Sequence, residues 1–586
     1  MKKRYTYLIS ICALFSTISL TSCRTILDYY KGVTIDIDTN ISNGSISAYY
    51  EKNEINNGNK IQLGDKLYIK TLPDEGYMLD ELYINNRLCN DTPYFTVEKD
   101  YYMVRATFKP ITYSNDNLKE IDAKLTHSDI YNSKSLAVTP STGDVKILVV
   151  PIEFNDYDGF TQSELNSIRV SFNGNKIDNS NDYWESLSSF YKKSSYGKLN
   201  LSFDICDKYI PSFSGSDFKI KEQKDGEGSI AILDECRDKL TINSNKVNYK
   251  DYDSNKDGYV DGVWFIYNAK DQKEVYDERD FWAYVYSCVN DDKTGPKYAP
   301  DLDNPQFARY ANCSQLFLYS DSEQGFDAHT LIHEQGHMFG LDDYYTYDDS
   351  VKASGTGGLD MMDLNVGDHN AFNKFSLGWI KPKVITSVGE FKLKPISSSG
   401  EALILPTYKD INNPFNEYYI IEYYTNDNLY QLDSNKAYRD VYPRYFKDSG
   451  IRITHIDARL IDVRDNFINS NELSIDGINY PLDENKYYDI ACSNTASRSY
   501  KKTKNDLGYY NLIETLNILN KKSYNSFYYD ADGYSFLFKV GDVLNSNLQS
   551  NFFINNVYNH DGSLFNYSLR VEGLNKEYAS ISVKIV

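Results

Sequence analysis

The stretch HEQGHMFGLDD, residues 333–343, places two histidines four positions apart around a glutamate. On a helix, His333 and His337 project from the same face one turn apart, so both imidazoles can reach a single metal ion. Glu334 lies next to that face, near enough to hold a water on the metal without becoming a ligand. The stretch therefore predicts a helix that carries a metal site.

The turn after this helix is expected to supply a third ligand. Gly340 can take a left-handed conformation that ends the helix, which lets the chain double back and bring in Asp343. Three protein ligands leave a position open for water, as in catalytic zinc sites, and zinc lowers the pKa of that water to about 7. Glu334 would then act as general base and pass the proton to the leaving amine of a cleaved peptide bond. The alternative, a chance pattern on a structural helix, is disfavoured because the whole chain has only 7 His.

The sequence contains other candidates for the third ligand. A second class of zinc peptidase takes a Glu from a helix further along the chain, but no Glu occurs between Glu334 and Glu390. Asp343 stands where related enzymes often place a third His, and it is therefore preferred. The fallback ligands are Asp368 and His369.

Three further residues near the motif have candidate roles. Met362, with Met361 in reserve, is the candidate for a methionine that forms an apolar floor beneath the zinc, and ordinary core packing is the alternative. His329 lies one turn before the motif and is expected to support the site or to lie at the surface. Tyr345 is a weakly supported donor to an oxyanion, because the chain has 54 Tyr.

Residues 253–261 read DSNKDGYVD and match the pattern D-x-N-x-D-G-x-x-D. Alternating oxygen ligands around a glycine turn can wrap a hard cation such as Ca2+. Trp264 stands where an EF-hand has its bidentate Glu, so an EF-hand switch is rejected in favour of a structural calcium clamp, with a plain acidic turn as the alternative. The expected ligands are the side chains of Asp253, Asn255, Asp257 and Asp261 and the carbonyl of Tyr259.

The N-terminus predicts export. Residues 1–22 have a basic start, MKKR, followed by an apolar run that is short for a membrane span. Leu20-Thr21-Ser22-Cys23 resembles a bacterial lipobox, in which the Cys is acylated after cleavage in front of it. Acylation of Cys23 would anchor the chain to a membrane from outside, and a plain secretory signal is the alternative. No other segment is long and apolar enough to span a bilayer.

Composition limits the partners. A formal net charge of -21 disfavours binding to a phosphate backbone, so nucleic acid is not an expected partner. Cysteine spacing leaves disulfides open: Cys206 with Cys236 or Cys288 with Cys313 can pair, and free buried thiols are an equal alternative. The oligomeric state is not predicted.

The patterning divides the chain into four parts after the signal. Residues 33–110 alternate apolar and polar positions and predict a small all-β module. Residues 111–142 are a polar linker, and 143–383 alternate helices and strands, as in an α/β domain. This last assignment rests on strands at 145–154 and 260–269, a helix at 228–240, and a helix-then-strand segment from DYWESLSS to LSFDI. Residues 384–586 are strand-rich and predict a β-sandwich-like region.

Two resemblances follow from short stretches. Within the first module, the order Gly64-Asp65, Pro73, Gly76-Tyr77, Ile84-Asn85-Asn86, Tyr94-Phe95 and Ala106-Thr107-Phe108 resembles the internalin-B-like repeats of bacterial surface proteins. Between residues 143 and 586 the chain contains ILVVPIEFND, SFYKKSSYGKLNL, YDSNKDGYVDGVWFIYNA, HEQGHMFGLDDYY, DMMDLNVGDHNAFNKFSLGWIKP, EYYIIEYY and GIRITHIDA. With these stretches it resembles the immune inhibitor A-like zinc metallopeptidases.

That second resemblance implies a multidomain protein whose α/β (α+β) protease domain is metzincin-like. It implies that His333, His337 and Asp343 bind zinc and that Glu334 is the general base. Asp342 departs from the family, in which many relatives have Pro, and this changes the turn but no ligand.

The sequence therefore predicts an exported, lipid-anchored zinc endopeptidase that acts on protein or peptide substrates. The alternative is a surface adhesin or binding protein whose protease fold has lost its activity. The intact Glu334 favours the enzyme, because a decayed site has no reason to keep its base.

Overall fold

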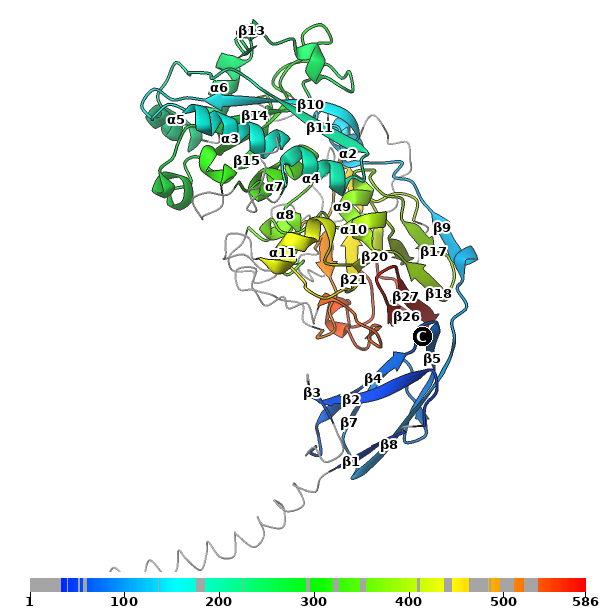
Figure 1. Cartoon of the computed structure of the whole chain (residues 1–586). Helices are drawn as coiled ribbons and strands as arrows, with labels where there is room; N and C mark the ends of the chain where they lie inside the picture. Colours follow the sequence, from blue (N-terminus) through cyan, green and yellow to red (C-terminus); the bar gives the residue numbers. More distant parts are fainter. Residues whose placement is uncertain are drawn as a thin grey trace, which may run out of the picture.

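The computed structural model describes residues 33–586 except for 39, 51–52, 56–60, 135, 175–184, 225, 291–295, 320–325, 348–354, 408–410, 437–444, 463–482, 484–485, 496–510 and 521–535. The predicted signal segment 1–22 and the predicted lipidation residue Cys23 lie outside the described residues. The fold is a mixed α/β arrangement of several sheets, with a small β module at one end and a helix-covered sheet at the other (Figure 1).

The N-terminal module consists of two four-stranded sheets around a core of its own. Alternating burial along β8 places Tyr102, Val104 and Ala106 inside and their neighbours outside, as one face of a solvated sheet requires. One sheet has the order β1 (Thr34–Ile37), β8 (Tyr101–Pro110), β5 (Tyr77–Ile84), β6 (Arg87–Leu88). The other has the order β3 (Asn53–Glu54), β2 (Gly44–Tyr50), β4 (Lys66–Pro73), β7 (Tyr94–Thr96).

The segment predicted as a linker, 111–142, is structured where it is described. A 3-10 turn (Asn115–Asn117) leads into β9 (Leu118–Glu120), which pairs antiparallel with β17 (Lys383–Ile385). Helix α2 (His127–Ser133) follows, and a capping box at Thr126 and Asp129 fixes its start. The segment thus packs against the body of the protein.

The central sheet has the order β11 (Leu199–Ile205), β10 (Gly143–Ile152), β14 (Val263–Tyr267), β16 (Arg309–Ser314), β15 (Tyr284–Ser287). Its pairs are parallel except β15 with β16. All five residues of β14 are buried, as expected for a parallel strand covered on both faces. The helices on this sheet are α3 (Gln162–Asn173), α4 (Leu187–Ser194), α5 (Gly215–Glu222), α6 (Glu227–Cys236) and α7 (His329–Met338).

The strands predicted at 145–154 and 260–269 are confirmed as β10 and β14, and the helix predicted at 228–240 is confirmed as α6. β10 begins and ends two residues earlier than predicted, β14 is shorter than predicted, and α6 is shorter because a turn follows Cys236. The helix-then-strand segment is confirmed as α4 and β11.

Two sheets in the strand-rich region share one core. The larger has the order β24 (Ile513–Thr515), β21 (Gly450–Asp457), β20 (Glu417–Tyr424), β19 (Leu403–Pro406), β17, β9. The smaller has the order β18 (Gly389–Leu393), β27 (Ala579–Ile585), β26 (Tyr567–Leu574), β25 (Val543–Leu544). Apolar residues of both sheets meet in this core, as in Ile421 of β20 and Val571 of β26.

One predicted strand of this region is not formed. The strand-rich pattern includes YSFLFKV, residues 534–540, of which the structure describes 536–540, and among these Phe538 makes only an isolated bridge to Ile451. The shorter elements elsewhere are β22 (Leu460–Asp462), β23 (Tyr488–Ile490), β12 (Thr241–Ile242), β13 (Asn245–Lys246), α8 (Met361–Leu364), α9 (Ala371–Ser376), α10 (Ile396–Ser399) and α11 (Gln431–Asn435).

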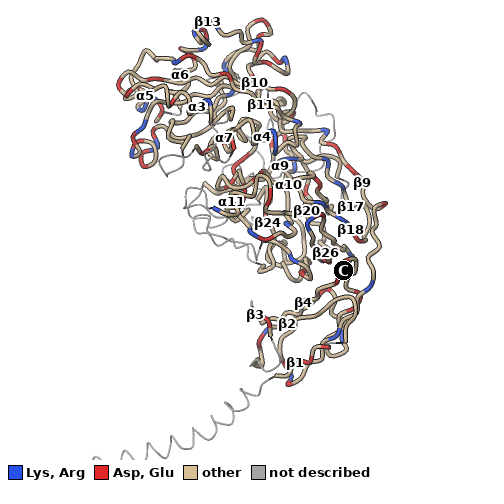
Figure 2. The backbone as a smooth tube through the Cα atoms, in the orientation of Figure 1, with Lys and Arg blue, Asp and Glu red and all other residues tan. Residues whose placement is uncertain are grey.

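The six cysteines after Cys23 are buried free thiols, so of the alternatives left open by the sequence the structure has free thiols and neither disulfide. Within the described part of the chain, no helix has the combination of length and apolar character needed to cross a membrane. Asp and Glu are distributed over all parts of the fold, with Lys and Arg between them (Figure 2).

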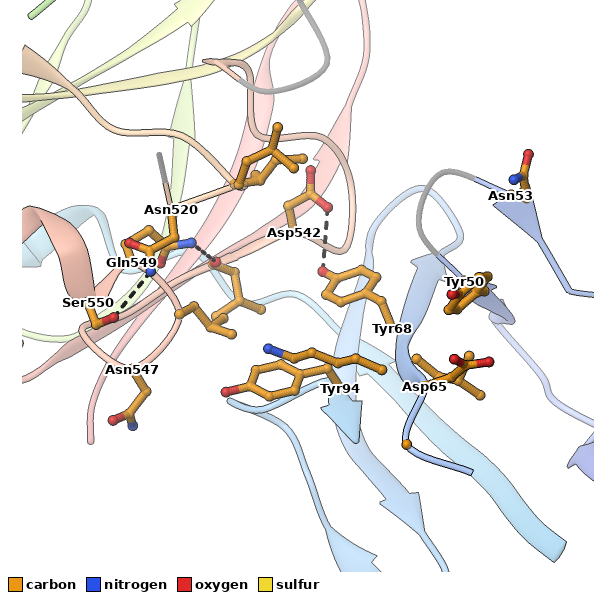
Figure 3. A pocket seen from close by; sticks show the side chains of 17 residues that line it. Tyr50, Asn53, Asp65, Tyr68, Tyr94, Asn520, Asp542, Asn547, Gln549 and Ser550 are labelled. Atoms are coloured by element: carbon orange, nitrogen blue, oxygen red, sulfur yellow. Dashed lines mark hydrogen bonds between the residues drawn. The ribbon is translucent and has the colours of Figure 1, made fainter. Parts of the chain in front are cut away.

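The N-terminal module docks on the smaller C-terminal sheet through buried polar contacts. Arg570 of β26 donates from Nη1 to Thr71 Oγ1 (3.1 Å) and from Nη2 to the carbonyl of Asn90. The backbone N–H of Leu79 donates to Glu572 Oε2 (3.1 Å). A cavity of about 1180 Å³ opens beside this junction, where Tyr68 faces Asp542 across the two parts (Figure 3).

We expect Arg570→Met to loosen this junction, because it removes a buried guanidinium that donates to acceptors on both sides. The loss should be about 2–3 kcal/mol of unfolding free energy. Hydrogen–deuterium exchange at β4 and β5, together with thermal melting, measures it. Arg105→Met is the matched control, since Arg105 is exposed on the module. Equal exchange in the two variants would show that docking does not depend on Arg570.

Candidate metal centre

Helix α7 is buried along nearly its whole length, and His337 is the described exception. Its side chains fix it to its surroundings: Trp264 Nε1 of β14 donates to Gln335 Oε1 (3.0 Å), and Tyr191 Oη of α4 donates to the carbonyl of Ile332 (2.6 Å). At Gly336 an added Cβ would lie 2.5 Å from the Sδ of Met362, so a larger residue would displace that sulfur. The helix is therefore held between the sheet and α8.

The end of α7 has the predicted conformation. Gly340 has φ +93, in the left-handed region, and its N–H donates to the carbonyl of His337 (2.9 Å). The N–H of Leu341 donates to the carbonyl of Gly336 (3.1 Å), which completes a Schellman motif. A Cβ at Gly340 would also lie 2.6 Å from the ring of Tyr131. Glycine is therefore required both by the backbone conformation and by this close contact. The chain turns back here and brings Asp343 to the helix.

Three donor atoms converge after this turn. Asp343 Oδ1 lies 3.0 Å from His333 Nε2 and 3.1 Å from His337 Nε2, and the two nitrogens are 3.1 Å apart. Three ligands at zinc-like bond lengths in a tetrahedron lie about 3.3 Å from one another. The spacing therefore fits a group of ligands around one small cation, and this group can hold a metal ion.

The other nitrogen of each imidazole is fixed by a backbone carbonyl. His333 Nδ1 lies 2.8 Å from the carbonyl oxygen of Met361, and His337 Nδ1 lies 2.7 Å from that of Leu341. A carbonyl only accepts, so each Nδ1 carries the proton and each Nε2 presents its lone pair to the centre. This is the support that histidine ligands of metals usually have.

The electrostatics of the centre favour positive charge. Burial alone would lower the pKa of His337, but the carboxylate of Asp343 raises it to about 10. Burial alone would raise the pKa of Asp343, but His337 and His333 hold it well below its usual range. A divalent cation satisfies the same preference that these shifts express.

Glu334 belongs to the site without belonging to the ligand group. Its side chain is buried, and burial raises the pKa of its carboxyl, with Asp343 acting in the same direction and the two histidines against it. It is not among the three residues whose ligand atoms converge. A carboxyl with a raised pKa beside a metal is suited to taking up and releasing a proton.

Two tyrosines border the centre. Tyr347 Oη donates to Asp343 Oδ2, which leaves Oδ1 for the two imidazoles. The ring of Tyr345 stacks near that of His333, with centroids 6.4 Å apart and planes 25° apart. Burial, followed by the charge of Asp343, raises the pKa of Tyr345, so its hydroxyl keeps its proton and can donate a hydrogen bond.

Met361 and Met362 lie in the one-turn helix α8, which begins at Asp360. Both side chains are fully buried. The sulfur of Met362 packs against Gly336 of α7, while the carbonyl of Met361 holds His333. Met362 therefore contacts the metal-site helix through its side chain, and Met361 contacts it through its backbone.

The fallback ligands lie apart from this group. Asp368 pairs with Lys374 Nζ (2.7 Å) and accepts from Ser194 Oγ (2.5 Å). His369 Nε2 lies 3.2 Å from Tyr191 Oη, and burial holds its pKa well below the usual range. Asp343 is the acidic residue that completes the group with His333 and His337.

His329, one turn before the motif, is clamped between two carboxylates. Its Nδ1 lies 2.6 Å from Asp327 Oδ1 and its Nε2 lies 3.1 Å from Asp433 Oδ1 of α11. Burial alone would lower its pKa, but the two aspartates raise it to about 10. Asp433 also accepts from the N–H of Gly367 (2.7 Å), so His329 ties the start of α7 to the strand-rich region.

The 253–261 loop forms a tight turn whose carboxylates accept backbone N–H groups. Asp253 accepts from Asp257 N (3.0 Å) and Gly258 N (3.1 Å), and Asp261 Oδ2 accepts from Ser254 N (3.0 Å). Asn255 donates to Asp257 Oδ2 (2.9 Å), and the N–H of Tyr259 donates to Asp257 Oδ1 (2.9 Å).

Three carboxylates lie close to one another in this loop. Burial raises the pKa of Asp261 to about 7, with Asp253 and Asp257 acting in the same direction. Its Oδ1 is buried without a hydrogen-bond partner among the described residues. The three carboxylates are not one of the convergent groups, so their oxygens would have to turn inward to share a cation.

A second convergent group was not predicted from the sequence. Among the residues that the structure describes, two groups of three side chains have ligand atoms within 4.8 Å of one another, and the second is Glu417, His455 and His560. These residues are far apart in the chain, and only strand pairing brings them together. The one local signal is a histidine within the strand GIRITHID.

The chain matches no family model and no curated protein. What the centre at α7 can do follows from its own donor atoms and their surroundings. They form a buried, pre-oriented group for one divalent cation, with an acidic side chain beside it.

We expect His329 to give the fold a pH-dependent stability. Its folded pKa of about 10 exceeds the unfolded value of 6.5, so its contribution is full below pH 6.5 and is lost as the pH rises through about 10. His329→Gln should cost about 3–5 kcal/mol at pH 6, because it leaves two buried carboxylates without their cation. Urea unfolding of both proteins from pH 6 to pH 10 measures the difference. A difference that stays constant over this range would contradict the assignment.

Proposed function

We propose that this protein is a zinc-dependent endopeptidase. The observation that carries the proposal is the convergence of His333 Nε2, His337 Nε2 and Asp343 Oδ1, each about 3 Å from the others, beside the buried carboxyl of Glu334. Two imidazoles and one carboxylate are the ligand types that zinc takes in catalytic sites with three protein ligands. The same constellation supports the likeness to the immune inhibitor A-like peptidases and to the metzincin-like fold.

The residues of the chain have separate tasks in this proposal. His333, His337 and Asp343 would hold the metal, which when bound supplies a Lewis acid for a peptide carbonyl and for water. Glu334 accepts a proton from the attacking water and delivers it to the amine that leaves, because a carboxyl with a raised pKa can work in both directions near neutral pH. Tyr345, which keeps its proton, would donate to the carbonyl oxygen.

Carbonyl acceptors and packing keep this arrangement rigid. The backbone of Met361 and Leu341 holds the two imidazoles, and Tyr347 holds Asp343. Met362 forms part of the apolar support for α7. Rigid ligands bind a metal without a reorganisation cost, which favours tight binding.

The cellular setting follows from the N-terminus. We propose that the chain is exported, that Cys23 is acylated and anchors it to the outer face of a membrane, and that its substrates are proteins or peptides. The all-β module would then separate the peptidase from the membrane surface.

The decisive experiment compares Glu334→Gln with Asp343→Asn. Glu334→Gln should keep zinc and lose casein cleavage by roughly 10²–10⁴-fold, because it removes only the proton carrier. Asp343→Asn should lose the zinc ion of this centre and, with it, cleavage. Asp342→Asn is the matched control, since this neighbouring buried carboxylate is not in the ligand group. Zinc content and cleavage rate are measured on each purified protein.

Two results would overturn the proposal. One is zinc-loaded protein that cuts no protein substrate, with Glu334→Gln indistinguishable from the parent. This result would favour a surface adhesin built on a protease fold. The other is zinc content unchanged in Asp343→Asn.

We also propose that the 253–261 loop binds calcium. Gly258 has φ +85, and an added Cβ would lie 2.7 Å from the N of Asp301, so the turn is fixed for glycine. Asp261 Oδ1 is a buried acceptor beside two further carboxylates, and a hard cation would be a partner for all three. Asp253, Asn255, Asp257, Asp261 and the carbonyl of Tyr259 are the proposed ligands.

Calcium should raise the melting temperature of the protein. At a calcium concentration about 100 times the Kd, the gain should be about 2.7 kcal/mol. Asp261→Asn should remove the calcium-dependent shift, whereas Asp251→Asn, an exposed acidic residue before the loop, should keep it. Differential scanning calorimetry with calcium and with a chelator measures the shift, and an equal shift in both variants would place calcium elsewhere.

A further inference from the structure

The second convergent group lies at one end of the paired strands β20 and β21, inside the larger C-terminal sheet. In the register of β20 and β21, Glu417 is opposite Asp457 and Tyr419 is opposite His455. Residues two apart on a strand share a face, so these four side chains lie on the same side of the sheet. His560 comes from the loop before β26 and reaches this face from outside it.

The contacts within the group are short. His455 Nε2 lies 2.9 Å from Glu417 Oε1, and the backbone N–H of His560 donates to the same oxygen at 2.7 Å. The rings of His455 and His560 are 4.5 Å apart and nearly perpendicular, at 79°. One ligand atom from each of the three side chains lies within 4.8 Å of the other two.

The group is buried, and one of its acceptor atoms makes no hydrogen bond to a described residue. Glu417 is 3% exposed and His455 is 2% exposed. The second oxygen of Glu417, Oε2, makes no hydrogen bond to any described residue, and the nearest cation is Arg459 Nη2 at 3.4 Å. A buried carboxylate oxygen without a hydrogen bond is costly, and a metal ion would be a partner for it.

The charged residues near the group do not fully neutralise the carboxylate of Glu417. Arg459 is engaged by Asp457, to which it donates from Nε (2.7 Å) and Nη2 (2.8 Å). Glu417 then remains as a carboxylate without a full counter-charge, and Glu514 of β24 is opposite His455 in the register. A divalent ion between the imidazoles and Glu417 would balance this buried negative charge.

Asp457 also orients one of the imidazoles. Its Oδ2 lies 3.0 Å from His560 Nδ1, and a carboxylate beside one ring nitrogen leaves the other ring nitrogen as the acceptor. The pairing of carboxylate, imidazole and metal is the usual support of a histidine ligand.

We propose that Glu417, His455 and His560 bind a second zinc ion, separate from the centre at α7. Two imidazole nitrogens and both oxygens of Glu417 would supply four donor atoms, which is the number a structural zinc site has. The ion would fasten the loop around His560 to strands β20 and β21. Asn559, next in that loop, already accepts from Tyr419 Oη at 2.8 Å. The proposal does not depend on peptidase activity.

The test counts zinc in a protein whose first site has been removed. His333→Asn with His337→Asn abolishes the centre at α7. After incubation with zinc and removal of free metal, this double variant should retain one zinc per chain by mass spectrometry of the metal. Adding His455→Asn and Glu417→Gln should reduce the content to none. Adding His127→Asn instead is the matched control, because His127 is also a buried histidine but has no place in a convergent group.

A melting experiment covers the case in which the added substitutions impair folding. Zinc should raise the melting temperature of the His333→Asn, His337→Asn protein, with calcium kept constant, and the further His560→Asn substitution should abolish the rise. The proposal is overturned if the double variant holds no zinc, or if it melts at the same temperature with and without zinc. It is also overturned if removing Glu417 and His455 leaves the zinc content of a folded protein unchanged.

Discussion

The structure around α7 depends on the closeness of three ligand atoms that together attract positive charge. His333 Nε2, His337 Nε2 and Asp343 Oδ1 are held within 3.1 Å of one another inside the protein. Such a cluster of acceptors is unfavourable unless a cation lies among them. The Schellman turn at Gly340, the carbonyls of Met361 and Leu341, and the buried faces of α7 all impose that closeness. The local fold therefore holds three ligand atoms in the arrangement that binds positive charge.

Residues of the strand-rich region support helix α7 and the segments that follow it. Asp433 of α11 binds His329 and the N–H of Gly367, and Glu422 of β20 accepts from the N–H of Ala371 (3.0 Å). Arg452 of β21 pairs with Glu422 in turn. The hydrophobic core that contains α7 also contains Ile420 and Ile456 of these strands. The start of the metal-site helix and the segments after it are thus supported by residues that lie 51 to 104 positions further along the chain.

The sequence revealed the α7 centre because its information is local. A helical period places His333 and His337 together, and one glycine turn returns Asp343, so the eleven residues 333–343 contain nearly the whole geometry. The same local logic identified β10, β14 and α6. It failed for YSFLFKV. Phe536 and Leu537 of this stretch pack in the hydrophobic core, and Phe538 forms an isolated bridge instead of part of a strand. It also gave no sign of β9, because a three-residue strand is defined by its partner β17.

The second group shows which kind of site local sequence patterns cannot predict. Glu417, His455 and His560 are brought together by the register of β20 with β21 and by a loop that returns more than a hundred residues later. No periodicity in the chain encodes that register. The two groups also differ in what surrounds them. At α7 a buried Glu334 stands beside the ligands without joining them, whereas at the second group the neighbouring carboxylate, Asp457, is already paired with Arg459 and His560. The first arrangement is suited to moving protons and the second to holding strands together.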